Sequence, residues 1–478
     1  MRKVLSVASE CVPLIKTGGL ADVVGALPAA LAPEGWEMRV LIPAYRGVLD
    51  KLKDIKQVWA EDDLFGGPGR VLAGRHGRLD VLVLEAPHLF DRAGGPYSVE
   101  GRDFGDNAER FAALSHAAAS IARDGDAEGW RPEVLHAHDW QTGLAPAYLR
   151  WHGGAERVAS LMTIHNIAFQ GHARPDRLGA LRLPPESFNA DGVEYWGNIS
   201  TLKAGLTCAD AITTVSPRYA DELMRGEFGL GLEGVIAARA GQLHGILNGI
   251  DTEIWNPETD TSITPFSARK TSGKAKNRKA LLKEFGLGDV PGPLAVLISR
   301  LTPQKGIDLV AEAAGDFVAQ GGGLCVLGSG DAWAEEAMRG LAGYFPERVG
   351  VRIGYDEDLS HLMFAGGDAV LVPSRFEPCG LTQLYGLRYG TIPVVAATGG
   401  LADTVIGATP ATLAAGAATG VVFHPVDTLA LRQALRKLVA LHADTPTWKA
   451  MVRRAMAADF GWAASAARYA RLYESIAR

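Results

Sequence analysis

The sequence has little cysteine. Its four cysteines, Cys11, Cys208, Cys325 and Cys379, lie far apart and form no C-x-x-C pair. The sequence therefore predicts neither a disulfide framework nor a cysteine-based zinc site. A reducing cytoplasm is the simplest setting for such a chain, so we expect a cytoplasmic protein.

Long apolar runs and blocks of positive charge are also missing. No stretch approaches the ~20 apolar residues that a membrane-spanning helix needs. The apolar run at the start is broken by Ser6, Ser9, Glu10 and Pro13, which indicates a buried first strand and not a signal peptide. The net charge is −6, and no Lys/Arg block is long enough to follow a phosphate backbone. We therefore expect no membrane and no nucleic-acid partner.

What the chain does have is a repeated pattern of short β-branched runs, each followed by an amphipathic segment. This pattern is typical of βαβ units and a parallel sheet. In the first half we expect strands at 3–8, 81–84, 134–137, 161–164 and 211–215, and in the second half at 294–299, 324–327, 351–353, 369–372 and 392–396. With 478 residues, two Rossmann-like α/β domains are predicted.

The boundary between the two patterns lies at Asn248-Gly249-Ile250-Asp251. An irregular stretch rich in Pro, Thr and Ser follows to about Ser272 and indicates a connection between domains. In open α/β sheets, ligands bind beyond the carboxyl ends of the strands. We therefore expect two parallel sheets that face a central cleft, with the chemistry in that cleft.

One strand-end segment, residues 16–22, is suited to an anion. It follows the first expected strand and opens a helix that runs through Leu31. Gly18 and Gly19 allow the backbone to approach a ligand, the first helical amides point outward, and Lys16 adds positive charge. For Gly18-Gly19 taken alone, a plain strand-to-helix turn is the more common interpretation.

A second such segment, residues 300–306, follows an apolar strand. Thr302 is a suitable N-cap and Pro303 fits the first helical position, which places Arg300 and Lys305 at a helix start. Basic side chains repel the positive end of a helix, so Lys305 is an unusual choice for a simple surface position. The segment therefore predicts a phosphate site.

Two further loops follow strands in the second half. Residues 374–382 contain Glu377, and residues 398–401 contain Gly399 and Gly400. A carboxylate such as Glu377 is suited to bind sugar hydroxyls or to offset positive charge near an anomeric carbon. For Glu377 taken alone, a solvated loop glutamate is the simpler interpretation.

In the first half, residues 136–140 end one strand and residues 163–166 end another. A metal site is disfavoured, because Trp140 and Gln141 stand where a metallohydrolase ligand set needs Asp and His. A sugar site fits better: Asp139 accepts from hydroxyl groups, while Trp140 and Tyr97 offer flat apolar faces. His165 is either a hydrogen-bonded core histidine or a cleft residue, and its place beyond a strand end favours the cleft.

Together these segments closely resemble bacterial glycogen synthases and plant starch synthases. The resemblance spans nearly the whole chain and rests on KTGGLADV at Lys16, HAHDWQTGLAP at His136, TIHNIAFQG at Thr163, LNGID at Leu247, SRLTPQKG at Ser299 and PSRFEPCGLTQLYGLRYG at Pro373. It implies the GT-B architecture, with a first domain at 1–247, a donor-binding domain at 248–459 and a final helix at 460–478 that packs back on the first domain.

The activity implied by the resemblance is transfer of glucose from ADP-glucose to the non-reducing 4-hydroxyl of an α-1,4-glucan such as glycogen, with retention of configuration and release of ADP. No metal and no cofactor are implied. Physical chemistry does not separate ADP-glucose from UDP-glucose, so a UDP-glucose-using synthase is an alternative, as is a pyridoxal-phosphate-dependent glucan phosphorylase. A non-catalytic glucan-binding protein is disfavoured because a neutral polysaccharide needs no phosphate-binding cations.

The resemblance also implies roles for individual residues. Arg300 and Lys305 neutralise the diphosphate, and Glu377 and His165 lie near the reacting carbon; these four are the expected catalytic residues. The other expected donor contacts are Lys16, Gly18, Gly19, Asn248, Tyr355, Cys379, Thr382, Gly399 and Gly400, with Tyr355 bordering the adenine. The expected acceptor contacts are Asp139, Tyr97 and Trp140. Related retaining transferases carry a second glutamate eight positions after the first, whereas this chain has Tyr385, as does the synthase branch.

Overall fold

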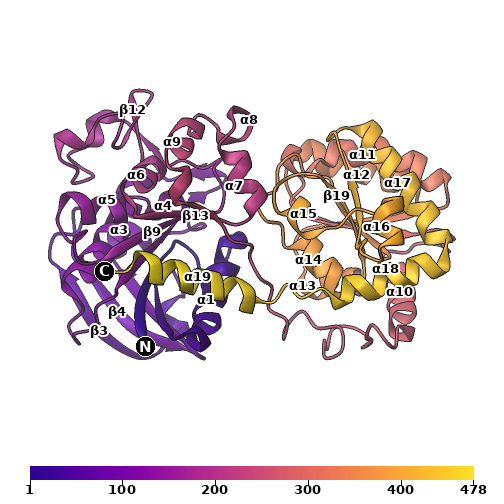
Figure 1. Cartoon of the computed structure of the whole chain (residues 1–478), viewed down its shortest axis with the longest axis horizontal. Coiled ribbons are helices and arrows are strands. Elements are labelled where there is room, and N and C mark those ends of the chain that lie inside the picture. Colours follow the sequence, from indigo (N-terminus) through magenta and orange to yellow (C-terminus); the bar gives the residue numbers. More distant parts are fainter. The chain divides into compact units, whose positions relative to one another are not determined.

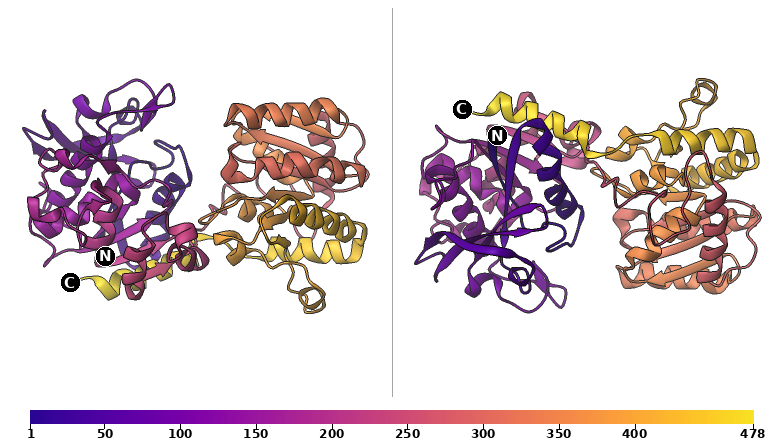
Figure 2. Two further views of the ribbon diagram at one scale, coloured as in Figure 1. Left: turned by 90° about the horizontal axis from the view of Figure 1, so that it is seen from above. Right: turned by 90° about the horizontal axis from the view of Figure 1, so that it is seen from below.

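The computed structural model describes all 478 residues. The chain folds into two compact units, one made of residues 1–249 and 462–478 and the other of residues 250–461. The boundaries expected at 248 and 460 lie two residues before these. Each unit has its own β-sheet with helices packed against it (Figures 1 and 2). None of the helices combines the length and apolar character needed to cross a lipid bilayer.

The first unit is built on a nine-stranded sheet with the order β14-β13-β9-β8-β1-β2-β5-β4-β3. Its strands are β1 (Arg2–Val7), β2 (Trp36–Pro43), β3 (Lys53–Glu61), β4 (Gly69–His76), β5 (Leu79–Glu85), β8 (Val134–His138), β9 (Ala159–Ile164), β13 (Ala211–Thr214) and β14 (Leu243–Gly245). Seven of them are parallel; β1, β5, β8, β9 and β13 were expected from the sequence, whereas β2 and β14 were not.

The other two strands, β3 and β4, form an antiparallel extension at one edge of this sheet. The alternation of expected strands and helices did not predict this hairpin. Its outer strand β3 is mostly exposed and carries Lys53, Asp54 and Lys56 at its start. Such charged residues suit an edge strand, because they discourage pairing with another chain.

The helices of the first unit include α1 (Gly19–Leu31), α3 (Asn107–Asp124), α4 (Asp139–Thr142), α5 (Leu144–Trp151), α6 (Thr201–Cys208), α7 (Pro217–Leu223), α8 (Gly226–Gly229) and α9 (Glu233–Ala238). The last helix of the chain, α19 (Trp462–Ile476), also belongs here and packs against α1 (Figure 1). Tyr469 and Tyr473 of α19 are fully buried with Leu27 and Leu31 of α1. The Tyr473 hydroxyl lies 2.8 Å from Nδ1 of His136 in β8.

Two small sheets lie outside this core. One has the order β10-β12-β11, made of β10 (His172–Ala173), β12 (Asn198–Ser200) and β11 (Glu194–Tyr195). The other pairs β6 (Ser98–Val99) with β7 (Arg102–Asp103).

The second unit has a fully parallel six-stranded sheet with the order β17-β16-β15-β18-β19-β20. The strands are β15 (Leu294–Ile298), β16 (Gly323–Gly328), β17 (Val349–Ile353), β18 (Ala369–Val372), β19 (Ile392–Ala396) and β20 (Val421–Phe423). Its helices are α10 (Ser272–Glu284), α11 (Ile307–Ala319), α12 (Ala332–Tyr344), α13 (Glu357–Gly366), α14 (Thr382–Arg388), α15 (Gly399–Thr404), α16 (Pro410–Ala414), α17 (Thr428–Ala443) and α18 (Thr445–Ala457).

Both sheets contain a point where the strand order reverses. In the first unit β1 leads to β2 on one side and β8 leads to β9, β13 and β14 on the other; in the second unit β15 leads to β16 and β17, and β18 leads to β19 and β20. Ligands of open α/β sheets bind beside such a switch point, at the carboxyl ends of the two central strands. The loops after β1, β8, β15 and β18 are therefore the favoured positions for a site.

The connecting segment, residues 250–271, has no helix or strand, as the sequence predicts. It is nevertheless anchored to the second unit. The Trp255 indole is stacked between the rings of His361 in α13 and Tyr385 in α14, at centroid distances of 3.9 and 3.8 Å. The buried Asp260 carboxylate accepts a hydrogen bond from the Tyr389 hydroxyl and lies 2.7 Å from Nδ1 of His361.

Candidate active site

In the second unit, the loops after β15 and β18 bring Lys305 and Glu377 together. The Lys305 ammonium lies 2.6 Å from Oε2 of Glu377, and the Ser374 hydroxyl donates to the same oxygen at 2.8 Å. Both charged side chains are largely buried. They line one pocket together with Thr382 and Gly380. This pocket lies at the switch point of the sheet and combines a cation, a carboxylate and hydroxyl groups.

The backbone around Lys305 differs from the sequence-based expectation. Thr302 stands at an N-cap position and Pro303 at the first helical position, but they open only a single 3-10 turn that ends at Lys305. The α-helix α11 begins at Ile307, after Gly306 in the left-handed region. A Cβ at Gly306 would lie 2.2 Å from the Pro373 carbonyl oxygen, so close approach of the two loops forces this break. Because of it, Lys305 precedes the first turn of α11.

Arg300, the other expected phosphate-binding cation, is exposed and forms no ion pair. Lys305, in contrast, forms an ion pair with Glu377. A guanidinium without a carboxylate partner is available to an anionic ligand.

Gly399 and Gly400 support the Glu377 loop from behind. The Gly400 N–H donates to the carbonyl oxygens of Glu377 and Pro378, each at 3.1 Å. A Cβ at Gly399 would lie 2.0 Å from the Glu377 oxygen, and one at Gly400 would lie 2.2 Å from the Cys379 oxygen. These glycines therefore allow α15 to pack against the loop. Their expected donor contact, and that of the buried Cys379, stay predictions.

Two expected donor contacts stand apart from this pocket. Tyr355 follows β17, two strands away from β15, and its ring is 79% exposed while its hydroxyl is bonded to Glu357. Asn248 is buried at the end of the first unit, and its Oδ1 makes no hydrogen bond. An unpartnered buried amide oxygen is costly, which is consistent with a ligand-binding role.

The first unit contains a second cluster, around Asp139 at the end of β8. Its Oδ1 accepts from the backbone N–H groups of His165, at 2.6 Å, and Asn166, at 3.3 Å. Asp139 itself has a φ of +55°, a strained conformation for a non-glycine residue. Burial raises the pKa of its carboxyl to about 7, and the two N–H donors lower it in part. Asp139 and His165 are thus held together at the switch point.

The three histidines of this region differ in role. His136 is a core histidine bonded to Thr163 and Tyr473, and Nε2 of His138 lies 3.0 Å from the Ser6 hydroxyl. Nδ1 of His138 lies 2.9 Å from Nε2 of His165. Burial lowers the pKa of His165 to about 3, so its imidazole is neutral at physiological pH.

Glu10, a residue not singled out from the sequence, organises the glycine loop after β1. Its buried carboxylate accepts from the backbone N–H groups of Thr17 and Gly18 and from the hydroxyl groups of Thr17 and Tyr97. The Gly18 N–H that we expected at a diphosphate is thus bonded within the protein, at 3.2 Å. Only the position of Glu10, between a buried strand and a Gly-Gly turn, hinted at this role.

The remaining expected residues surround this loop. Lys16 is exposed and lies 2.8 Å from Asp22 in α1, and Gly19 is the first residue of that helix. Tyr97 and Trp140 both pack on the buried Phe111 ring, at centroid distances of 5.9 and 5.2 Å. Each ring keeps some exposed surface. The expected acceptor contacts therefore share one aromatic cluster.

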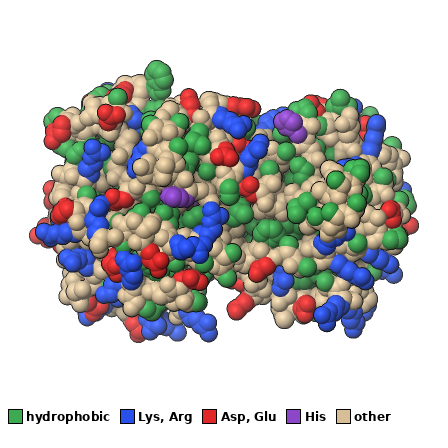
Figure 3. All heavy atoms as spheres, in the orientation of Figure 1, with side chains coloured by type: hydrophobic (Ala, Val, Ile, Leu, Met, Phe, Trp, Pro, Cys, Tyr) green, Lys and Arg blue, Asp and Glu red, His purple; other side chains and the backbone are tan.

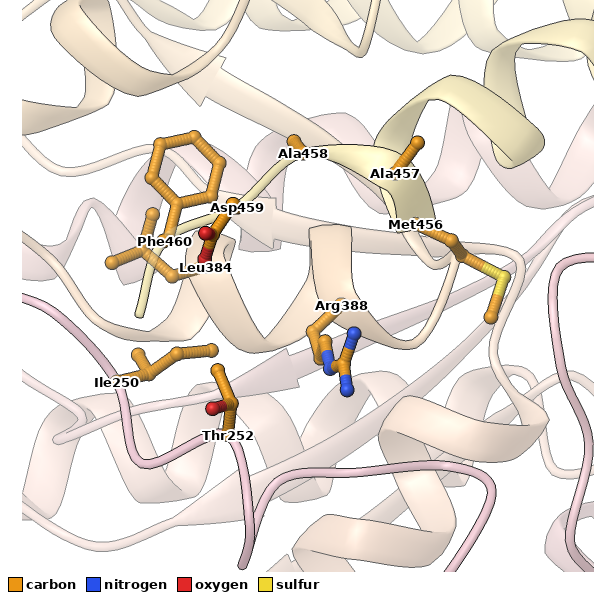
Figure 4. A pocket seen from close by; sticks show the side chains of 9 residues that line it. All are labelled: Ile250, Thr252, Leu384, Arg388, Met456, Ala457, Ala458, Asp459 and Phe460. Carbon is orange, nitrogen blue, oxygen red and sulfur yellow. The ribbon is translucent and has the colours of Figure 1, made fainter. Parts of the chain in front are cut away.

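A separate pocket lies in the second unit, where the connecting segment meets α14 and the end of α18 (Figure 4). Ile250, Thr252, Arg388 and Asp459 are among its lining residues. It contains none of the expected site residues. On the face drawn in Figure 3, positive and negative side chains are interspersed, and no continuous basic band crosses it.

Comparison with known proteins places this geometry in a family. Residues 3–238 match the family model described as the starch synthase catalytic domain, and residues 292–440 match that of glycosyl transferases group 1. A glycogen synthase of Cereibacter sphaeroides is 62% identical over 474 residues, covering 99% of this chain and 98% of that protein. A glycogen synthase of Paracoccus denitrificans is 57% identical over 478 residues and covers both chains completely.

Two solved structures have a similar fold. The catalytic domain of starch synthase IV from Arabidopsis thaliana, bound to ADP and acarbose, has a TM-score of 0.89 and 32% identity, with 99% of each chain covered. Sucrose-phosphate synthase from Thermosynechococcus elongatus has a TM-score of 0.62 at 19% identity, again over 99% of each chain, and supports the fold alone. The chain therefore belongs to the glycogen synthase and starch synthase family of glycosyltransferases, with the two Rossmann-like domains of the GT-B fold.

Proposed function

We propose that this protein transfers glucose from ADP-glucose to the non-reducing 4-hydroxyl of an α-1,4-glucan such as glycogen, with retention of configuration and release of ADP. The observation that carries the proposal is the pocket in which Lys305 faces Glu377; the exposed, unpaired Arg300 lies in the same loop as Lys305, two residues after β15. The full-length likeness to glycogen synthases and the ADP in the starch synthase IV structure support the choice of substrates.

The donor diphosphate is the natural ligand for the two cations. Arg300 has no carboxylate partner, and the Lys305 ammonium is shared with only one carboxylate oxygen. As the bond to the anomeric carbon breaks, negative charge builds up on the departing ADP, and fixed cations stabilise that charge. Metal-dependent glycosyltransferases use a divalent ion for this task. We propose that Arg300 and Lys305 replace it, so that no metal or cofactor is required.

We assign Glu377 a role at the donor sugar. Lys305 and Ser374 both contact its Oε2, which fixes the orientation of the carboxylate within the pocket. A negative charge beside an oxocarbenium-like carbon stabilises the transition state. We propose that Glu377 borders the donor glucose and forms no covalent bond to it; the neutral His165 is the sugar contact proposed for the first unit. Catalysis then depends mainly on positioning and on charge stabilisation.

The acceptor is bound by the first unit. Oδ1 of Asp139 is occupied by two backbone N–H groups, which leaves Oδ2 for a sugar hydroxyl. Tyr97 and Trp140 present apolar ring surface next to it, anchored on Phe111. A carboxylate oxygen beside flat apolar surface suits a glucose unit, which has hydroxyls at its rim and an apolar ring face.

Nucleotide release tests the proposal. The protein is incubated with ADP-glucose or UDP-glucose, with and without glycogen, in the presence of EDTA, and free ADP or UDP is measured. Glycogen-dependent ADP release in EDTA supports the donor, the acceptor and the independence from metal. Release from UDP-glucose alone refutes the donor assignment. Absence of release from either, combined with pyridoxal-phosphate absorbance in the purified protein, supports a phosphorylase instead.

A further inference from the structure

Three large apolar side chains are exposed on one corner of the first unit. Trp196 is 81%, Phe169 56% and Leu230 46% exposed. They converge because Gln170, next to Phe169, and Tyr195, next to Trp196, both donate side-chain hydrogen bonds to the Leu230 carbonyl oxygen, at 3.0 and 2.9 Å. We call Phe169, Trp196 and Leu230 the exposed apolar corner. It is made by the hairpin of β11 and β12, by the residue that follows α8 and by the loop after β9 (Figure 1).

A tryptophan at position 196 does not help the hairpin to fold. Strands β11 and β12 pair Tyr195 with Asn198, so Trp196 and Gly197 form a two-residue hairpin loop. Both have positive φ, +48° and +80°. Such loops strongly prefer Asn-Gly, because a bulky residue is strained in the left-handed region. This chain instead places a tryptophan there and exposes its ring to solvent. Leu230, with a φ of +48°, is strained in the same way.

The exposed apolar corner is linked to the proposed acceptor residues through the backbone and through packing contacts. The chain runs from Asn166, beside Asp139, to Phe169 in one turn closed by a 3.3 Å hydrogen bond. Gly171 packs so closely on the Trp140 ring that a Cβ there would lie 2.6 Å from it. The hydroxyl of Thr201, the first residue of α6, donates to the Trp140 carbonyl oxygen at 2.7 Å. The segments that carry the exposed apolar corner therefore pack directly against Trp140, one of the expected acceptor contacts.

We propose that Trp196, with Phe169 and Leu230, binds the α-1,4-glucan acceptor several glucose units away from its reacting end. The inference rests on the proposed function and deepens it. Apolar ring faces of successive glucose units pack on exposed aromatic surface, and their hydroxyls stay in water. Strained exposed residues and exposed apolar patches are both typical of binding sites. A neutral glucan needs no charged partner there, and the three side chains of the corner carry none.

The test uses Trp196→Asn, which creates the Asn-Gly loop that the hairpin prefers and should therefore fold. In the full-length protein we expect the Michaelis constant for glycogen to rise roughly five- to tenfold, since an exposed aromatic anchor is lost. Turnover with maltotriose, and the Michaelis constant for ADP-glucose, should change by less than about twofold, because neither reaches the corner. Retardation of the variant in glycogen-containing native gels should be reduced.

Tyr344→Asn is the matched control, because Tyr344 is 84% exposed at the end of α12 in the second unit. It should behave as the unmodified protein. Equal glycogen constants and equal gel retardation for Trp196→Asn and the unmodified protein would overturn the inference. An equal decrease in kcat/KM with maltotriose and with glycogen would also overturn the inference, because Trp196 would then contact the reacting end of the acceptor.

Two further outcomes are distinguishable. A dimer of the unmodified protein that Trp196→Asn converts to monomers, with glycogen binding intact, would make the corner an interface between two copies and overturn the inference. Absence of glycogen-dependent ADP release from the unmodified protein would instead refute the proposed function on which the inference rests. Phe169→Ala provides a second, independent variant and should shift the glycogen constant in the same direction.

Discussion

At the scale of single residues, the buried ion pair of Lys305 and Glu377 is the feature of the second unit to which we assign the donor chemistry. We expect Lys305→Ala to lower turnover by about 10²- to 10³-fold, because one cation that stabilises the departing ADP is lost. The Michaelis constant for glycogen should change far less. Steady-state kinetics with both substrates measure this. Lys279→Ala, at an exposed lysine of α10, is the control. A raised glycogen constant with intact turnover would contradict the role assigned to Lys305.

Asp139 predicts a pH dependence. Burial raises the pKa of its carboxyl to about 7, above its ordinary value of 3.8. Only the ionised carboxylate accepts a hydrogen bond at both oxygens, so the active form is lost as the pH falls through about 7. We therefore expect kcat/KM for glycogen to rise with pH up to about 7 and to level off above it.

Asp139→Asn tests this assignment. The variant should be about 10²-fold slower, and its activity should no longer change with pH near 7. A pH profile of kcat/KM from pH 5 to 9 measures this. The same rising limb in Asp139→Asn and the unmodified protein would show that another group titrates.

The sequence predicted some residues of the site better than others. Lys305, Glu377, Asp139 and His165 were selected because they lie in segments that follow apolar strands, where ligands bind, and their roles stay predictions. Glu10 was missed because its hydrogen bonds to Thr17, Gly18 and the distant Tyr97 form only when the loop after β1 folds back on it. The contacts of Gly399 and Gly400 with the Glu377 loop were missed for the same reason, since they arise only when two strand-end loops pack together.

At the scale of elements, helix α14 links the connecting segment to the donor pocket. Thr382 at its start lines the pocket with Lys305 and Glu377, while Tyr385 and Tyr389 contact Trp255 and Asp260. Tyr385 stands where related transferases carry a second glutamate. In this chain its ring instead stacks on Trp255, which gives that departure a structural role.

We expect Trp255→Leu to lower the free energy of unfolding by about 2–3 kcal/mol, because a buried ring stacked on both faces is replaced by a smaller side chain. Denaturant unfolding followed by circular dichroism measures the loss. Trp333→Leu, at a tryptophan that is 46% exposed on α12, should change stability by less than about 0.5 kcal/mol. Equal stability of the two variants would show that the aromatic stack does not anchor the segment.

Elements were predicted well where their periodicity was strong. The expected parallel strands are present in both sheets, because buried parallel strands are almost continuously apolar. The hairpin of β3 and β4 was not expected, since the mostly exposed, charged β3 lacks that signal. The single 3-10 turn at Pro303–Lys305 was taken for the start of a helix, because the backbone contact at Gly306 that ends it is invisible in the local sequence.

At the scale of the whole molecule, each unit brings its own switch point and its own set of polar residues. Lys305, Glu377 and Arg300 belong to the second unit, and Asp139 and His165 belong to the first. One set suits a nucleotide diphosphate and the other suits sugar hydroxyls. The two units also match two different family models, the starch synthase catalytic domain at residues 3–238 and glycosyl transferases group 1 at residues 292–440.

Proton NMR of the anomeric region during reaction of ADP-glucose with maltotriose tests retaining transfer to a glucan. We expect the donor signal to disappear, ADP to form, and a new α-1,4 anomeric signal of a longer maltooligosaccharide to appear at the same rate. A β-anomeric product, or ADP and free glucose without chain elongation, would contradict retaining transfer to a glucan.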